Sequence, residues 1–253
     1  MYHYKNMRHL KFISLLIALF VCTNVLAANN NTISIQIPTQ LSNGEDLAMP
    51  LKILILLSVL SLAPAILVTT TAFTRIIIVL SMLRHALGMP ETPPNQVLIS
   101  LALFLTLFTM MPVINKVNEQ AYTPYTNKQV NFREALDLAA TPIKDYMVRQ
   151  TREIDLQLMY ELSKKPTPKK LVEISFVQLV PAYMLSELKS AFQIGFIIFI
   201  PFLLVDLIVS SLLMSLGMMM LPPVVISLPL KILLFVLIDG WNLIIRSLLG
   251  SFH

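Results

Sequence analysis

The stretch that decides the fold is residues 201–241, "PFLLVDLIVSSLLMSLGMMMLPPVVISLPLKILLFVLIDGW". Its centre is "GMMMLPP", where Gly217 precedes three methionines and Pro222 and Pro223 follow them. On either side lies an almost unbroken apolar run, and about 18 apolar residues suffice for a helix to cross a bilayer. Glycine and a proline pair favour a non-helical turn. The stretch therefore predicts two antiparallel helices joined by an apolar turn.

The composition of the whole chain points the same way. Of its 253 residues, 56% are hydrophobic and only 13% are charged, whereas soluble domains are about 25% charged. We therefore expect an all-α membrane protein. The net charge of +5 is scattered, and no basic stripe interleaved with aromatic residues indicates nucleic-acid binding. The single cysteine, Cys22, excludes an internal disulfide and a metal site made only of thiolates.

The N-terminus has the pattern of a secretory signal peptide. Basic residues precede a short apolar run at 12–26, and small residues follow in "VLAANNN". This order predicts a signal peptide over residues 1–27, cleaved after Ala27. An uncleaved anchor helix is the alternative. Cleavage would leave residues 28–50 as a short polar lead on the periplasmic side.

The rest of the chain alternates between apolar and polar segments. The first apolar block, residues 51–87, is too long for one simple span, and Pro64 and a threonine cluster interrupt it, so it forms one bent helix or a broken one. The turn "GMPETPPNQ" joins it to a second block. The predicted fold is two long helical hairpins plus an inserted polar helical domain. The order is a first hairpin at 51–114, a polar domain at 115–190, and a second hairpin at 191–249 whose last block is Val224 to Leu249.

The polar domain carries a helical apolar pattern. Apolar residues recur at spacings of three, four and seven, which is typical of amphipathic helices. Pro142, Pro166 and Pro168 predict breaks. If each apolar block crosses once, this domain lies in the periplasm. The apolar positions are Ile143, Met147, Ile154, Leu158 and Leu162.

The second hairpin contains four charged residues, Asp206, Lys231, Asp239 and Arg246. A charged group at the centre of a lipid-embedded span costs roughly 2.5–3.5 kcal/mol. These segments are therefore expected to lie in a protein assembly or along a watery path. Folding the hairpin about its turn brings Asp206 and Lys231 to similar depth, which predicts an ion pair. Pairing with another subunit, or a lysine that reaches to the membrane surface, are the alternatives.

Two further charges are less constrained. Asp239 and Arg246 share a helix face but lie about 10 Å apart along its axis, so direct contact is not expected. Arg75 follows the threonine cluster. It could line a lumen, reach to an interface or pair with a neighbour.

No pattern indicates an enzyme. The histidines have no metal-ligand spacing, and the chain lacks a phosphate-binding glycine loop and a nucleophile motif. We expect no catalytic, metal or cofactor site. A small-molecule or ion transporter that couples through the four charges is the rival function. It predicts an internal repeat with matching broken helices, and the two hairpins are only loosely alike.

Several long stretches of the sequence resemble those of a known protein family. "FTRIIIVLSMLRHALG" (residues 73–88), "TPPNQVLISLALFLTLF" (92–108) and "PAYMLSELKSAFQIGF" (181–196) occur in order, followed by the stretch quoted first. They resemble the FliP/SctR family, core membrane proteins of type III export gates. The similarity covers roughly residues 50–253, and the signal peptide fits the flagellar branch.

The resemblance implies a pore-forming, non-enzymatic component of the flagellar protein export gate, at the basal body in the inner membrane and required for flagellum assembly. It implies about five copies of the chain assembled with FliQ and FliR, with FlhB associated. Unfolded flagellar subunits would be the cargo. Met218, Met219 and Met220 would form a gasket in the lumen. Methionine is flexible and fills irregular gaps, and apolar constrictions can gate by excluding water. Without the resemblance, packing filler in a turn remains an alternative for these methionines.

Overall fold

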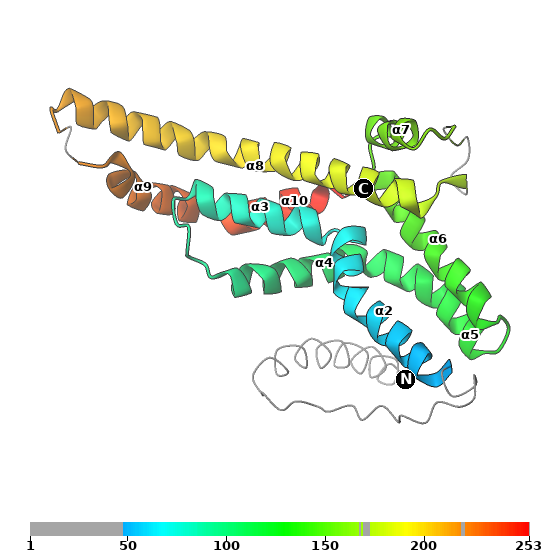
Figure 1. The fold of residues 1–253 in the computed structure, drawn as a ribbon. Helices are drawn as coiled ribbons and strands as arrows, with labels where there is room; N and C mark the ends of the chain where they lie inside the picture. The colour runs from blue at the N-terminus through cyan, green and yellow to red at the C-terminus, as the bar shows by residue number, and fades with distance from the viewer. Residues whose placement is uncertain (1–47, 167, 169–172, 219–220, 253) are drawn as a thin grey trace, which may run out of the picture. The chain divides into compact units, whose positions relative to one another are not determined.

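The structure is a computed structural model that describes residues 48–166, 168, 173–218 and 221–252 (Figure 1). The predicted signal peptide and Ala27, and two of the gasket methionines, Met219 and Met220, lie outside the described residues. The chain divides into the units Met1–Leu56 and Leu57–His253, and the interactions below lie within the second.

The described residues are helical and contain no strand, which confirms the predicted all-α fold. Three helices are long and apolar enough to cross a membrane, or four if a bent pair counts as one span. The helices are α2 (Ala48–Thr70), α3 (Phe73–Ala86), α4 (Asn95–Val117), the π-helical turn η1 (Asn118–Tyr122), α5 (Thr123–Thr126), α6 (Phe132–Gln150), α7 (Glu153–Leu162), α8 (Phe176–Ser215), α9 (Pro223–Leu237) and α10 (Gly240–Gly250).

The first apolar block is a broken helix, one of the two possibilities open from the sequence. The break lies between Thr70 and Phe73 and separates α2 from α3, while Pro64 stays inside α2. The Thr70 hydroxyl donates to the Ile66 carbonyl at 2.8 Å, and the Thr71 hydroxyl donates to the Leu67 carbonyl at 2.6 Å. Such back-bonding often bends helices and competes with the backbone ladder.

Helix α3 lies against α4 and α8 and forms the centre of the core. Gly195 of α8 permits the close approach, because a Cβ there would collide with the sulfur of Met82. The fully or nearly buried side chains of this cluster are Ile76, Val79 and Leu80 of α3, Leu98 and Ala102 of α4, Ala191 of α8 and Leu248 of α10.

Helix α8 is a single element of 40 residues and the longest in the described chain. It begins at Phe176, so residues 176–190 continue directly into the apolar block that starts at Ala191. Figure 1 shows it as the long yellow-to-orange helix, with α9 beside its C-terminal half. Pro181 and Pro201 lie within it without ending it.

The polar segment folds as α6 and α7 packed against α4 and α8. The predicted break at Pro142 is wrong: the residue is buried inside α6, and the helix continues to Gln150. Packing compensates for the backbone bond that proline removes. Of the predicted apolar stripe, Met147 is fully buried, but Ile154, Leu158 and Leu162 are exposed on α7. They are exposed because the buried face of α7 carries Asp155 and Tyr160 instead.

The last apolar block was expected as one segment from Val224 to Leu249, but it is bent by 67° between α9 and α10. Asp239 occupies the break with a φ of 51°, a left-handed conformation that asparagine and aspartate tolerate better than most residues. Gly240 follows, and a Cβ there would collide with the Phe235 ring. The bend thus depends on an Asp-Gly pair packed against an aromatic side chain.

Candidate functional site: the second hairpin and its charged residues

Asp206 and Lys231 form an ion pair across the α8–α9 hairpin. The Lys231 Nζ lies 2.6 Å from Asp206 Oδ2, in agreement with the pairing predicted from the hairpin register. The Ser227 hydroxyl donates to Asp206 Oδ1 at 2.6 Å. Ser227 and Lys231 are four residues apart and therefore share one face of α9. The α9 helix thus contributes two adjacent donors to one carboxylate of α8.

The two partners of this pair differ in exposure. The Lys231 side chain is 5% exposed, whereas that of Asp206 is 37% exposed. Lys231 also donates to the Ala86 carbonyl at the last residue of α3, at 3.3 Å. A cation at a helix C-terminus is favoured by the helix dipole. The lysine is enclosed within the chain, while the carboxylate keeps one side open to a neighbour.

Arg75 is buried and forms an ion pair with Glu187 of α8. Its Nε donates to Glu187 Oε2 at 2.8 Å, and its Nη2 donates to Oε1 at 2.5 Å. Arg75 could have lined a lumen, reached to an interface or paired with a neighbouring residue, and the structure shows the pairing. Sequence reasoning missed Glu187, which is fully buried. The signal that could have found it is a carboxylate at the start of a long apolar run, where a buried cation is the expected partner.

Asp239 and Arg246 are exposed, and Asn242 bridges them. Asn242 Nδ2 donates to Asp239 Oδ2 at 3.0 Å, and Arg246 Nε donates to Asn242 Oδ1 at 2.6 Å. The two charges are thus joined through Asn242 and not by direct contact. The four charges of the hairpin therefore form two separate hydrogen-bonded groups, which does not favour a single coupling site of a transporter.

The methionine turn begins with a glycine cap at the end of α8. Gly217 has a φ of 75°, and its N–H donates to the Met214 carbonyl at 3.1 Å. The Met218 N–H donates to the Leu213 carbonyl at 3.0 Å, which completes a Schellman-type helix end. Met218 is 42% exposed, so its side chain is available to a neighbouring molecule. Pro222 and Pro223 then begin α9, with Pro223 as its first residue.

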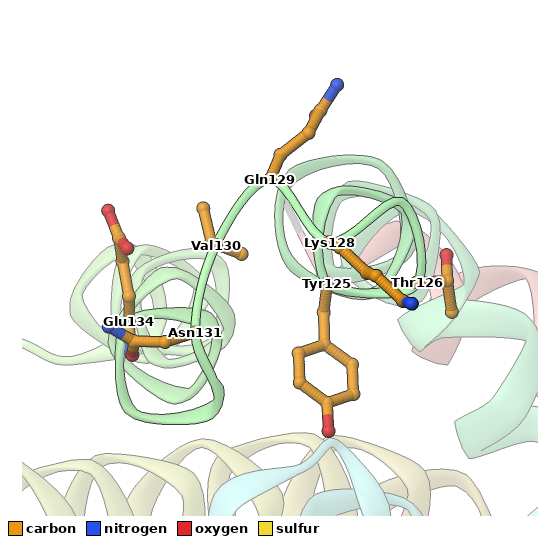
Figure 2. A pocket seen from close by; sticks show the side chains of 7 residues that line it. All are labelled: Tyr125, Thr126, Lys128, Gln129, Val130, Asn131 and Glu134. Atoms are coloured by element: carbon orange, nitrogen blue, oxygen red, sulfur yellow. The ribbon is translucent and has the colours of Figure 1, made fainter.

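A hollow lies on the polar segment, beside the loop that precedes α6. Figure 2 shows its lining, with Gln129 directed outward and Tyr125 below the loop. The Asn131 side chain accepts the Glu134 N–H at 2.9 Å and so caps α6. Among the described residues, no three His, Cys, Asp or Glu side chains lie together as a metal site. The lining residues are Tyr125, Thr126, Lys128, Gln129, Val130, Asn131 and Glu134.

Comparison with known proteins identifies the family. The model of the FliP family matches residues 56–248. A flagellar biosynthetic protein FliP of Bacillus subtilis (strain 168) is 54% identical over 211 residues, which are 83% of this chain and 96% of that protein. The one of Pectobacterium carotovorum subsp. carotovorum is 48% identical over 235 residues, 93% and 90% of the two chains. That of Aquifex aeolicus (strain VF5) is 46% identical over 219 residues, 85% and 92%. Because the family model matches most of the chain and these relatives are 46–54% identical over most of their own length, the chain belongs to the FliP family.

Proposed function

We propose that this chain is a pore-forming component of the flagellar protein export gate. Several copies assemble with FliQ, FliR and FlhB, and unfolded flagellar subunits pass through the assembly. The relatives' name, flagellar biosynthetic protein FliP, supports a role in flagellar assembly. The observation that best supports a pore is the α8–α9 hairpin. It ends in an exposed apolar turn, and its half-exposed Asp206 carboxylate lies within an apolar surface.

The surface of α8 supports an assembly. Of the most apolar 18-residue stretch of α8, only 17% is buried within the chain, and large apolar side chains are exposed along the helix. Exposed apolar area of this extent marks a membrane or protein contact. The half-exposed Asp206 has the exposed Leu203 one turn before it on the same helix, and a carboxylate facing lipid is costly. Neighbouring copies or partner subunits, rather than lipid alone, therefore cover this side. The exposed residues include Phe196, Ile197, Leu207, Ile208 and Leu212.

Met218, Met219 and Met220 form the seal of this pore. Three adjacent methionines from each of several copies give a ring of unbranched, polarizable side chains that fill irregular gaps. A narrow apolar ring excludes water and ions while it yields to a polypeptide. The glycine cap at Gly217 and the two prolines keep the turn from continuing either helix.

The placement in the cell follows from the same proposal. The signal peptide at 1–27 is removed after Ala27, which leaves the mature N-terminus and the lead at 28–50 in the periplasm. The polar domain at 115–190 lies on that side, between hairpins at 51–114 and 191–249. The assembly sits in the inner membrane at the flagellar basal body. Three to four helices with the length and hydropathy of a span are compatible with this multi-pass arrangement.

The test replaces Met218, Met219 and Met220 together with alanine. We expect an increased ion leak across the inner membrane with export of flagellar subunits retained, because the smaller side chains leave the ring open. Met214→Ala is the matched control, since Met214 is an exposed methionine one turn earlier on α8. An unchanged leak together with normal export would refute the seal.

A further inference from the structure

The Arg75 guanidinium makes five hydrogen bonds within the chain, and the export function proposed above does not use it. Besides the two bonds to Glu187, its Nη1 donates to the Ser251 carbonyl at 2.9 Å and to the Ser251 hydroxyl at 3.1 Å. Its Nη2 also donates to Gln150 Oε1 at 3.1 Å. Each of the five N–H donors of an arginine thus has an acceptor.

The C-terminal residues close over this arginine. Ser251 is the C-cap of α10, and its carbonyl is one of the groups that a helix end leaves without an intrahelical partner. The ring of Phe252 covers the guanidinium, with its centroid 4.1 Å from Cζ. Leu248, one turn earlier, is completely buried in the core around α3. A cation thus receives both a helix C-terminus and an aromatic face.

The same place on α8 gathers other segments. The Tyr183 hydroxyl donates to the Thr71 carbonyl at 2.8 Å, at the break between α2 and α3. The Ser186 hydroxyl donates to Asp155 of α7 at 2.6 Å. Tyr183 and Ser186 thus hold the end of α2 and the first turn of α7 to one short stretch of α8. Glu187 holds Arg75 at the same place, and the guanidinium in turn binds the ends of α6 and α10.

We propose that Ser251 and Phe252 are a clasp, closed on Arg75, that fixes α10 against α3 and α8. Helix α10 has only 11 residues, and the 67° bend separates it from α9. Its buried anchors apart from the clasp are Gly240, Ile244 and Leu248. Between the clasp at one end and the Lys231–Asp206 pair at the other, the limb that returns from the methionine turn is held at two polar points. The clasp is independent of the proposed pore, because the contacts that Ser251 and Phe252 make with Arg75 do not require the methionine turn to line a lumen.

The first experiment is carboxypeptidase digestion of the full chain in detergent, followed by mass spectrometry. In the unaltered chain we expect Ser251 and Phe252 to be retained, because both are held on Arg75. In Arg75→Lys we expect loss of Phe252 and Ser251, because an ammonium group offers three donors and no planar fork. Arg246→Lys is the matched control, since it makes the same exchange at an exposed site on α10 and should leave Phe252 in place.

The second experiment leaves the interior intact. Trp241, the only tryptophan of the chain, lies in the first turn of α10 and packs edge-on against Phe235 of α9, with ring centroids 5.5 Å apart. Deletion of residues 251–253 should increase acrylamide quenching of its fluorescence, because α10 is no longer fixed against α3 and α8 and Trp241 loses its packing on Phe235. Equal trimming of the unaltered and Arg75→Lys chains would overturn the clasp, as would quenching unaffected by the deletion. Neither readout measures ion leak or export, so failure of the clasp and failure of the proposed pore remain distinguishable.

Discussion

Lys231 is enclosed and Asp206 is half open, although the two side chains form one ion pair 2.6 Å long. This asymmetry predicts unequal effects of removing either charge. Asp206→Asn leaves a buried ammonium with the Ala86 carbonyl and a neutral amide as its remaining acceptors, which costs roughly 1–3 kcal/mol in free energy of unfolding. Lys231→Met leaves a carboxylate that water can reach and costs less. Thermal unfolding of the two variants in detergent measures which of the two substitutions destabilises the chain more.

Exchanging the two charges is the complementary test. Asp206→Lys combined with Lys231→Asp should recover part of the stability and export that each single change loses, because the pair re-forms with opposite sense. Recovery should be incomplete, because the Ser227 hydroxyl donates to the carboxylate at position 206 and the Ala86 carbonyl accepts from the ammonium at position 231. A double variant no better than the single ones would show that each residue acts through a different partner.

The crossing of α3 and α8 predicts a paired effect at Gly195. Gly195→Ala places a methyl group against the flexible end of Met82 and should destabilise the chain by about 1 kcal/mol, the low end of the usual cost of overpacking. Met82→Ala in the same chain should relieve the collision. The measurement is the melting temperature of the three variants. Gly250→Ala, where the added Cβ meets open space, is the control.

The break between α9 and α10 predicts a residue-specific effect at Asp239. Asp239→Val should destabilise the bend by about 1–2 kcal/mol, because a β-branched residue is strained at a positive φ. Asp239→Asn tolerates the same conformation and should unfold close to the unaltered chain. Equal melting temperatures for the valine and asparagine variants would mean that the left-handed conformation does not determine the stability here.

Tyr146 of α6 predicts a stability loss at high pH. Burial raises the pKa of Tyr146 from 10.0 to about 12, because the charged phenolate is poorly solvated there. The folded chain then keeps a proton that the unfolded chain releases, so this contribution is complete below pH 10 and falls as the pH rises to about 12. Tyr146→Phe removes the titration. Unfolding of both chains between pH 9 and 12 should show the steeper decline with tyrosine present, and parallel curves would contradict the shift.

Counting residues from the turn was enough to find one ion pair but not the other. Asp206 and Lys231 lie on two helices joined by a short turn, so their depth follows from the sequence alone. Arg75 and Glu187 are 112 residues apart, and nothing local links them. Glu187 also stood in a stretch interpreted as polar and water-exposed. The structure buries it because α8 begins at Phe176 and turns this residue toward α3.

The break in the last apolar block was missed because hydropathy outweighed local chemistry. The block is apolar on both sides of the bend, so a pattern of apolar residues alone predicts one continuous helix. The pair Asp239-Gly240 is a turn signal in its own right and marks the place of the bend. Pro142 was the opposite error, a local breaker that tertiary packing overrides.

The length of α8 sets a limit on where its two ends can lie. Forty residues at 1.5 Å each make a rod of about 60 Å, twice the roughly 30 Å of a hydrocarbon core. Glu187 and Met218 are about 45 Å apart along this axis, again at 1.5 Å per residue. If α8 runs close to the bilayer normal, the buried arginine pair and the methionine turn cannot occupy the same slab of lipid. With that orientation the two ends of α8 cannot both lie within the hydrocarbon, so at least one of them stands outside it.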